Sequence, residues 1–176
     1  MRHVLAALGF FLICLFCSIG CTSGDNCSSG GHCECSGGDQ CFLGCDGDHC
    51  DQDCHSVGSL CGTVCGDDCN SRCRDAGSVC SESCGARCTL DCGHTPTCGV
   101  QCGDNCHLTC HDTPECAAEV GPNSDVTCQS VGTICQVKCN GNCTVQCTNT
   151  PNCQISCADN ADATQCEPGR YACGGC

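Results

Sequence analysis

Cysteine spacing constrains this chain more than any other feature of its sequence. From Cys41 to Cys153 the cysteines follow one another mostly in steps of four, four, four and then six or seven residues. Between Cys116 and Cys128 two cysteines are missing, but Val120 and Ser124 hold their positions in the frame. Copies of nearly constant length, 18 to 20 residues here, are typical of stacked repeat proteins. The first cysteines of the seven copies are Cys41, Cys61, Cys80, Cys98, Cys116, Cys135 and Cys153.

The composition indicates that crosslinks replace an ordinary core. The chain has 33 cysteines among 176 residues and only 3% aromatic residues, a balance typical of exported disulfide scaffolds. At the N-terminus, Arg2 precedes an apolar run from Val4 to Phe16 that is too short for a mature membrane span. We therefore predict a signal peptide over residues 1–20 and an extracytoplasmic protein, secreted or lipid-anchored to the cell envelope.

The end of this leader resembles the lipobox of bacterial lipoproteins. The residues are Ser18-Ile19-Gly20-Cys21, and the resemblance implies that Cys21 becomes the lipidated first residue, although Ser18 replaces the usual leucine. Cleavage after Gly24 by an ordinary signal peptidase is the alternative. Both routes leave 30 of the 33 cysteines, since Cys14, Cys17 and Cys21 drop out, and an even number does not distinguish them.

The interior of each repeat predicts two short strands. Residues 135–147 contain two C-x-V-x-C segments around a three-residue turn, and in an extended strand the cysteines and the valine share one face. A helix with cysteines at i and i+4 is the rival, but Gly, Asp and Asn fill most short gaps. We predict an all-β fold, a small disulfide-rich β-solenoid of about seven coils. Residues 21–40 form an N-terminal linker and cap, 41–166 the solenoid, and 167–176 a C-terminal cap.

The central inward residue of these segments is not always aliphatic. Polar or small residues stand there in five segments, and Glu82 is the copy that fits the pattern least. These residues are Gln52, Thr63, Ser71, Glu82 and Ala118.

Geometry favours disulfides across turns. Cysteines at i and i+4 of one strand lie ~13 Å apart, beyond the reach of a disulfide, so partners lie across a turn or in the next coil. The missing pair at Val120 and Ser124 faces across a tight turn, which favours the first option; vertical ladders between coils are the alternative. The same scheme pairs Cys27 with Cys33, Cys35 with Cys41, Cys166 with Cys173 and Cys157 with Cys176. In the repeats the predicted pairs are Cys65–Cys69, Cys73–Cys80, Cys84–Cys88, Cys92–Cys98, Cys102–Cys106, Cys110–Cys116, Cys128–Cys135, Cys139–Cys143 and Cys147–Cys153.

Metal binding is the alternative function. Thiolate sites favour C-x-x-C or C-x-C pairs, which occur in the mature chain only at Cys173–Cys176 and Cys33–Cys35. Calcium prefers hard oxygen ligands, and acidic turn residues are expected along one edge of the rod, but Asp and Asn are also common turn residues. Those candidates are Asp67, Asp68, Asp104, Asn105, Asp159 and Asn160.

Charge and polar patterning exclude several classes. The net charge of −14 disfavours nucleic acid and anionic membrane surfaces, so a membrane contact is expected only through the N-terminal lipid. No regular threonine face points to ice binding. The histidines beyond His3 show no fixed ladder spacing, no catalytic constellation is recognisable, and we predict neither an enzyme nor a cofactor. These histidines are His32, His49, His55, His94, His107 and His111.

With its C-x-V-x-C segments, short turns and lipobox-like leader, the chain resembles the cysteine-rich tandem-repeat lipoproteins and secreted proteins of bacteria. The resemblance covers about residues 41–166 and implies architecture rather than activity. The function expected is a non-enzymatic scaffold with a surface-structural role or an unidentified extracellular or surface partner.

Overall fold

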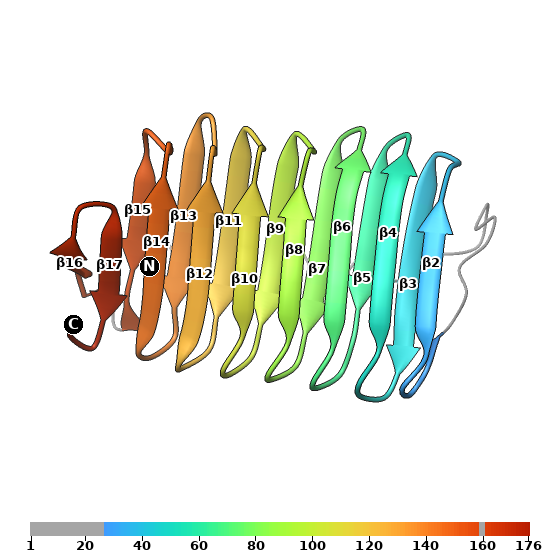
Figure 1. Cartoon of the computed structure of the whole chain (residues 1–176), viewed down its shortest axis with the longest axis horizontal. Coiled ribbons are helices and arrows are strands. Elements are labelled where there is room, and N and C mark those ends of the chain that lie inside the picture. Colours follow the sequence, from blue (N-terminus) through green and yellow to red (C-terminus); the bar gives the residue numbers. More distant parts are fainter. Residues whose placement is uncertain (1–26, 159–160) are drawn as a thin grey trace, which may run out of the picture.

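The computed structural model describes residues 27–158 and 161–176. The expected signal peptide, the lipidation site Cys21, and the candidate ligands Asp159 and Asn160 lie outside the described residues. Within the described part the chain is all-β and coils around one axis as a solenoid of about seven turns, which confirms the predicted fold class (Figure 1).

Two sheets face each other along the rod, and successive strands alternate between them. The odd-numbered sheet consists of β1 (Cys27–Ser28), β3 (Gln40–Asp46), β5 (Leu60–Val64), β7 (Val79–Cys84), β9 (Thr97–Cys102), β11 (Glu115–Val120), β13 (Ile134–Cys139) and β15 (Cys153–Ser156). The even-numbered sheet consists of β2 (His32–Ser36), β4 (Asp51–Val57), β6 (Asn70–Ala76), β8 (Thr89–Gly93), β10 (His107–His111), β12 (Ser124–Gln129) and β14 (Cys143–Thr148), followed by β17 (Arg170–Cys173) and β16 (Thr164–Glu167).

The spacing of the sequence repeat sets the register in which the strands of each sheet pair. Neighbouring coils pair in parallel with like position on like position, so Cys98 lies beside Cys116 and Cys116 beside Cys135. The strands alternate buried and exposed side chains, as in β13, where Cys135, Val137 and Cys139 point inward. Because a slip of one residue would turn the cysteines outward, the alternation holds every coil in this register.

Most turns of both kinds place a residue in the left-handed region. In the tight turns this residue directly precedes the next cysteine, as at Asp68 (φ 57°) and Asn105 (φ 58°). In the wide turns it precedes a buried residue, as His94 (φ 52°) precedes Thr95 and Ser130 (φ 55°) precedes Val131. Backbone hydrogen bonds also link each turn to the next coil, such as the Gly85 N–H donating to the Gly66 carbonyl at 2.9 Å. The turns therefore continue the stack at both edges.

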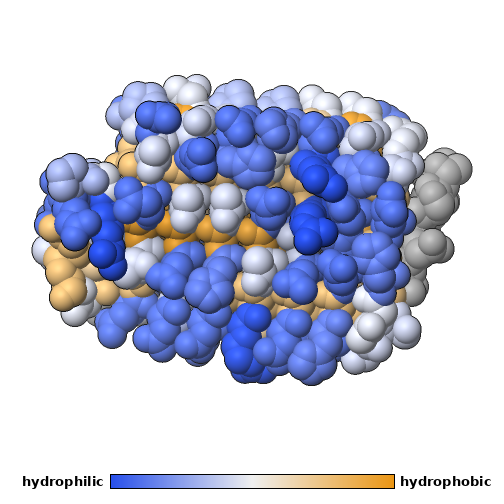
Figure 2. All heavy atoms as spheres, in the orientation of Figure 1, coloured by the Kyte–Doolittle hydropathy of each residue, from blue (hydrophilic) through white to orange (hydrophobic). Residues whose placement is uncertain are grey.

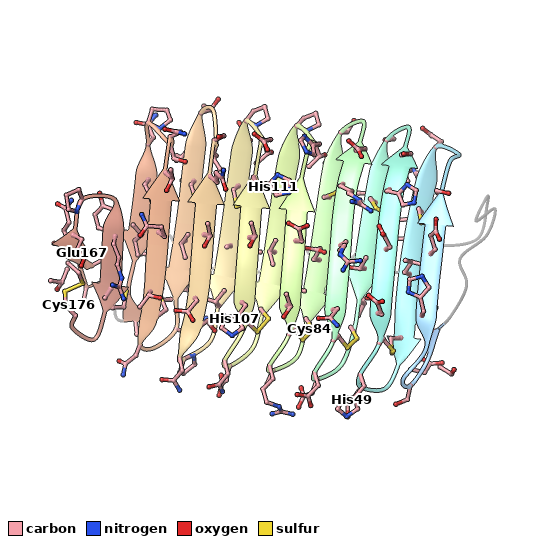
Figure 3. All side chains as sticks on the ribbon, in the orientation of Figure 1. His49, Cys84, His107, His111, Glu167 and Cys176 are labelled. Atoms are coloured by element: carbon pink, nitrogen blue, oxygen red, sulfur yellow. A yellow bond between two sulfur atoms is a disulfide. The ribbon has the colours of Figure 1, made fainter. Side chains whose placement is uncertain are left out.

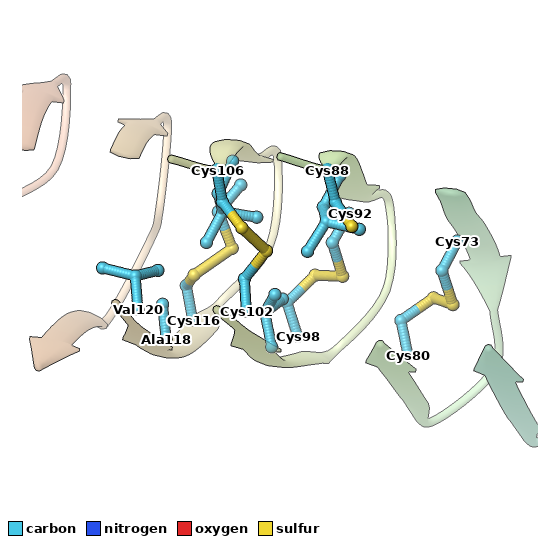
Figure 4. Close-up of a cluster of buried hydrophobic side chains, with 14 of the residues drawn as sticks. Cys73, Cys80, Cys88, Cys92, Cys98, Cys102, Cys106, Cys116, Ala118 and Val120 are labelled. Carbon is cyan, nitrogen blue, oxygen red and sulfur yellow. A yellow bond between two sulfur atoms is a disulfide. The ribbon is translucent and has the colours of Figure 1, made fainter. Parts of the chain in front are cut away.

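The core is a layer of sulfur and small aliphatic side chains between the two sheets. Leu90, Leu108, Val126 and Val145 form one row along the even-numbered sheet, and cysteines flank it on both sides. Figure 4 shows cysteines from both sheets meeting in this layer. With so little apolar area per coil, the disulfides are the principal constraint on the fold.

The parallel stack both begins and ends earlier in the chain than the predicted range of residues 41–166. It begins at Cys27 rather than at residue 41, because β1 and β2 pair in parallel with β3 and β4. The last parallel strand, β15, ends at Ser156 rather than near 166. Beyond it, β16 and β17 form an antiparallel hairpin that lies against β14. The hairpin caps the even-numbered sheet at the C-terminal end of the rod (Figure 1).

Candidate functional site

All 30 cysteines of the described residues are in disulfides. The nine repeat pairs expected across turns are present, with Cα–Cα distances from 5.7 Å for Cys73–Cys80 to 6.6 Å for Cys128–Cys135. Cys27–Cys33 and Cys35–Cys41 are also present. The rod is thus linked across its turns, except at the tight turn between Val120 and Ser124, and the thiolates that a soft metal would need are in S–S bonds.

The predicted pairing of the last four cysteines is wrong. Cys157 bonds to Cys173, and Cys166 bonds to Cys176. The register of the β16–β17 hairpin is irregular between Gln165 and Glu167, so Cys166 has no residue directly opposite it in β17. Cys173 instead lies in register with Cys143 of β14, at the end of the stack. The across-turn rule fails here because the parallel repeat geometry has ended.

The acidic turns do not converge on a calcium site among the described residues. Arg87 lies in the turn after Asp67 and Asp68 and donates hydrogen bonds to Asp68 from Nε and a terminal nitrogen, both at 2.7 Å. These hydrogen bonds lower the pKa of Asp68 and raise that of Arg87. The guanidinium of Arg87 also donates to Asp67 at 3.3 Å, so this cation neutralises charge of the Asp67–Asp68 turn, and the backbone N–H of Arg87 donates to the Asp104 carbonyl of the following turn. The arrangement does not favour metal binding.

The outer face of the even-numbered sheet is a hydrophilic surface of paired charges. Acidic and basic side chains meet across neighbouring coils, as in His55–Glu34 at 3.0 Å and Arg74–Asp53 at 3.0 Å. Figure 2 shows hydrophilic residues in rows over this face, with hydrophobic residues visible between the rows. An exposed arginine–carboxylate pair contributes about 0.2–1 kcal/mol, so such pairs add specificity of register more than stability.

His111 makes the most contacts of the histidines on this face. Its two ring nitrogens lie 3.2 Å from Asp91 and 3.0 Å from Asp112, and its ring packs edge-on against His94 at 5.0 Å. The ring lies over Gly93, where any side chain would collide with it. Figure 3 shows His111 near the wide-turn edge of β10 and His107 near the tight-turn edge.

Sequence reasoning missed this pairing of histidines with acids. His32 pairs with Asp51, and His107 pairs with Asp125. The sequence pattern that predicts these pairs is an acidic residue one repeat away from each histidine, 18 to 21 residues along the chain. A fixed spacing between the histidines themselves is not needed.

The outer face of the odd-numbered sheet carries a groove of about 690 Å³ that crosses β7, β9, β11, β13 and β15. Its floor is a row of small side chains, with Ser81, Gly99 and Ala117 in register on successive strands. A methyl group at Gly99 would meet no atom closer than 3.9 Å, so the space above the floor is open. Gln136 and Gln154 continue the same row on β13 and β15 and line the groove there.

One side of this groove carries polar and charged groups. Ser83, Gln101, Glu119 and Lys138 form the neighbouring row. The Lys138 Nζ donates to Glu119 at 2.7 Å and Asn140 donates to the same carboxylate oxygen at 3.0 Å, and these bonds lower the pKa of Glu119. The groove therefore combines an uncharged floor with hydrogen-bonding groups along its length.

The polar inward residues gather into one buried cluster. Ser71 Oγ lies 2.7 Å from Thr63 Oγ1 and donates to Glu82 at 2.9 Å, while Gln52 donates to the Leu43 and Val64 carbonyls, both at 3.2 Å. Glu82 is 1% exposed, and its second carboxyl oxygen has no hydrogen-bond partner. Burial raises the pKa of Glu82 well above its ordinary value of 4.5. The carboxyl is thus an unfavourable core group that the cluster only partly satisfies.

No protein-family model, curated protein or solved structure matches this chain. Across residues 27–158 and 161–176, no helix has the length and apolar character needed to cross a membrane.

Proposed function

We propose that this protein is a non-enzymatic, extracytoplasmic repeat scaffold that binds an extended partner along the groove of the odd-numbered sheet. A disulfide-rich solenoid fits a structural extracellular role, since so many disulfides persist only in an oxidising compartment. The groove carries the proposal: it runs across five successive strands on a rod whose coils are each crosslinked. A surface of this kind is rigid before binding, which lowers the entropic cost of association.

The chemistry of the groove favours an extended chain with its own amide or hydroxyl groups. The small floor at Gly99 and Ala117 admits a chain lying along the rod axis, and Gln101, Gln136 and Gln154 offer both donors and acceptors beside it. An extended peptide segment of a surface protein meets these requirements.

A photo-crosslinking residue in place of Ala117 tests the binding surface. Expressed in the protein's own cells, this variant is expected to give a discrete adduct on illumination, because position 117 is exposed on the groove floor. The same residue at Thr127, on the outer face of the opposite sheet, is the matched control and is expected to give none. Adducts are detected by mass shift on a non-reducing gel.

A blocking substitution sharpens the same test. Gly99→Trp fills the open space above the floor and is expected to abolish the adduct at position 117, whereas Thr109→Trp on the other sheet leaves it unchanged. Equal adducts at positions 117 and 127, or an adduct that survives Gly99→Trp, would contradict binding in this groove.

The compartment and the anchor are tested by the intact mass of the exported protein. We expect a deficit of two hydrogens for each disulfide, no alkylation of the unreduced protein, and a diacylglycerol on Cys21, as the lipobox resemblance implies. A mature chain that starts at Asp25 without lipid would support secretion instead. Many reactive thiols in the exported protein would contradict the disulfide scaffold itself.

A further inference from the structure

The disulfides of the tight turns form a continuous column of sulfur atoms. The two sulfurs of Cys45–Cys50 and the sulfur of Cys65 in the next coil all lie within 4.8 Å of one another. The same holds for Cys65–Cys69 with Cys84. It holds again for Cys84–Cys88 with Cys102. Each of these three disulfides therefore has the first cysteine of the next one within 4.8 Å.

This contact has the form required for thiol–disulfide exchange. In that reaction a thiolate attacks one sulfur of a disulfide, a new S–S bond forms, and the other sulfur leaves as a thiolate with no net oxidation or reduction. Cys45, at the first tight turn, is only partly buried, whereas its partner Cys50 is 1% exposed. A small external thiol can thus reach the column at Cys45.

We propose that the tight-turn column is an intramolecular exchange path that moves a free thiol from coil to coil. Two external thiols reduce Cys45–Cys50 and leave as their own disulfide. The Cys45 thiolate then attacks Cys65, forming Cys45–Cys65 and releasing Cys69 as a thiolate, while the Cys50 thiol stays free.

The following steps repeat this exchange. Cys69 attacks Cys84 and releases Cys88, and Cys88 attacks Cys102 and releases Cys106. The protein then contains three bonds between coils and two free thiols, one of them at Cys106, three coils from the point of entry. The free thiol moves along the rod by exchange, and the coil in which reduction occurred is closed again by a new disulfide to the next coil.

The path ends where the column is interrupted. After Cys102–Cys106 the next coil has Val120 and Ser124 in the two sulfur positions, in register with Cys102 and Cys143 respectively. Figure 4 shows Cys102 and Cys106 in the core, with Val120 in the following coil. The thiol should therefore stop at Cys106 and not reach Cys139 or Cys143.

A Cys50→Ser variant tests the path without any reductant, because it leaves a single thiol at Cys45. The exported, folded variant is incubated at pH 8.5, near the pKa of an ordinary cysteine, then alkylated and mapped by peptide mass spectrometry. We expect label at Cys69, Cys88 and Cys106 as well as at Cys45, and none at Cys139 and Cys143. The wide-turn cysteines, such as Cys92 and Cys110, are the internal control and should stay unlabelled.

A bridged variant tests the role of the gap. Adding Val120→Cys and Ser124→Cys restores the missing pair and is expected to extend the label to Cys143. Label confined to Cys45, label spread equally over the wide-turn cysteines, or label at Cys143 without the bridge would each overturn the proposal. If Cys50→Ser is not exported folded, the wild-type protein treated with one equivalent of dithiothreitol is mapped; label at Cys69, Cys88 and Cys106 beside Cys50, with none at Cys139 and Cys143, is then the expected outcome.

Discussion

Complete reduction is expected to abolish the β-sheet circular dichroism of this protein in buffer without denaturant. Most of its disulfides close loops of four to seven residues, and each contributes about 2 kcal/mol by the chain-entropy argument. Together they exceed the net stability of about 5–15 kcal/mol that folded domains usually have. The apolar remainder, chiefly single aliphatic side chains in some of the strands, is too small to hold two sheets together.

The measurement compares the far-ultraviolet spectrum before reduction and after reduction with alkylation of every thiol. Alkylating reagent without reductant is the first control. The second is Cys65→Val with Cys69→Ser, which copies the arrangement at Val120 and Ser124 and should keep the spectrum while lowering stability by about 2 kcal/mol. A fully alkylated protein that retained its native spectrum would show that hydrogen bonding and packing suffice without crosslinks.

Replacing Glu82 by valine is expected to stabilise the protein by about 2 kcal/mol at pH 8. The folded carboxyl has a raised pKa, so the folded state keeps its proton at pH values where the unfolded chain releases it. Binding of that proton contributes to the free energy of unfolding. This contribution is fully present below the pKa of the unfolded chain, near 4.5, and is lost as the pH rises through the pKa of the folded protein. Valine removes the free-energy cost of burying the carboxyl and is the residue that the neighbouring strand has in register, at Val100.

Guanidinium unfolding of the disulfide-intact protein at pH 4 and pH 8 measures this effect. The gain from Glu82→Val should be larger at pH 8 than at pH 4, and Glu82→Gln should lose the pH dependence while keeping the hydrogen bond from Ser71. Glu115→Val, at an exposed position of β11, is the matched control with no expected gain. A loss of stability on Glu82→Val at both pH values would show that the buried cluster is needed for folding.

The cysteine frame was sufficient to predict the solenoid and the pairing within its repeats. A period of 18 to 20 residues with cysteine, aliphatic and cysteine on one face permits two strands and two turns per coil, and the reach of a disulfide excludes pairs within a strand. At Cys166 and Cys173 the same reasoning failed, because the chain reverses into an antiparallel hairpin whose register no repeat specifies.

The polar inward residues contain information about the core that the cysteine spacing alone does not give. Taken singly, Thr63, Ser71 and Glu82 contradict the aliphatic pattern. Since they stand in successive segments of the chain, a coil brings them together, and the two hydroxyl groups form hydrogen bonds that satisfy one of the two carboxyl oxygens of Glu82. The groove was not predictable in this way, because it depends on the coincidence of small outward residues on neighbouring coils.

The coil without a tight-turn disulfide carries a consequence for the length of the protein. Residues 116–128 keep their register because the strands on either side pair with them along their whole length. Each coil is thus placed by its two neighbours, and neither end of the chain specifies how many coils lie between. Duplication or loss of a whole copy would lengthen or shorten the rod by one strand spacing and leave both ends unchanged. The length of the rod is therefore determined by the number of repeat copies, which recombination between copies can change.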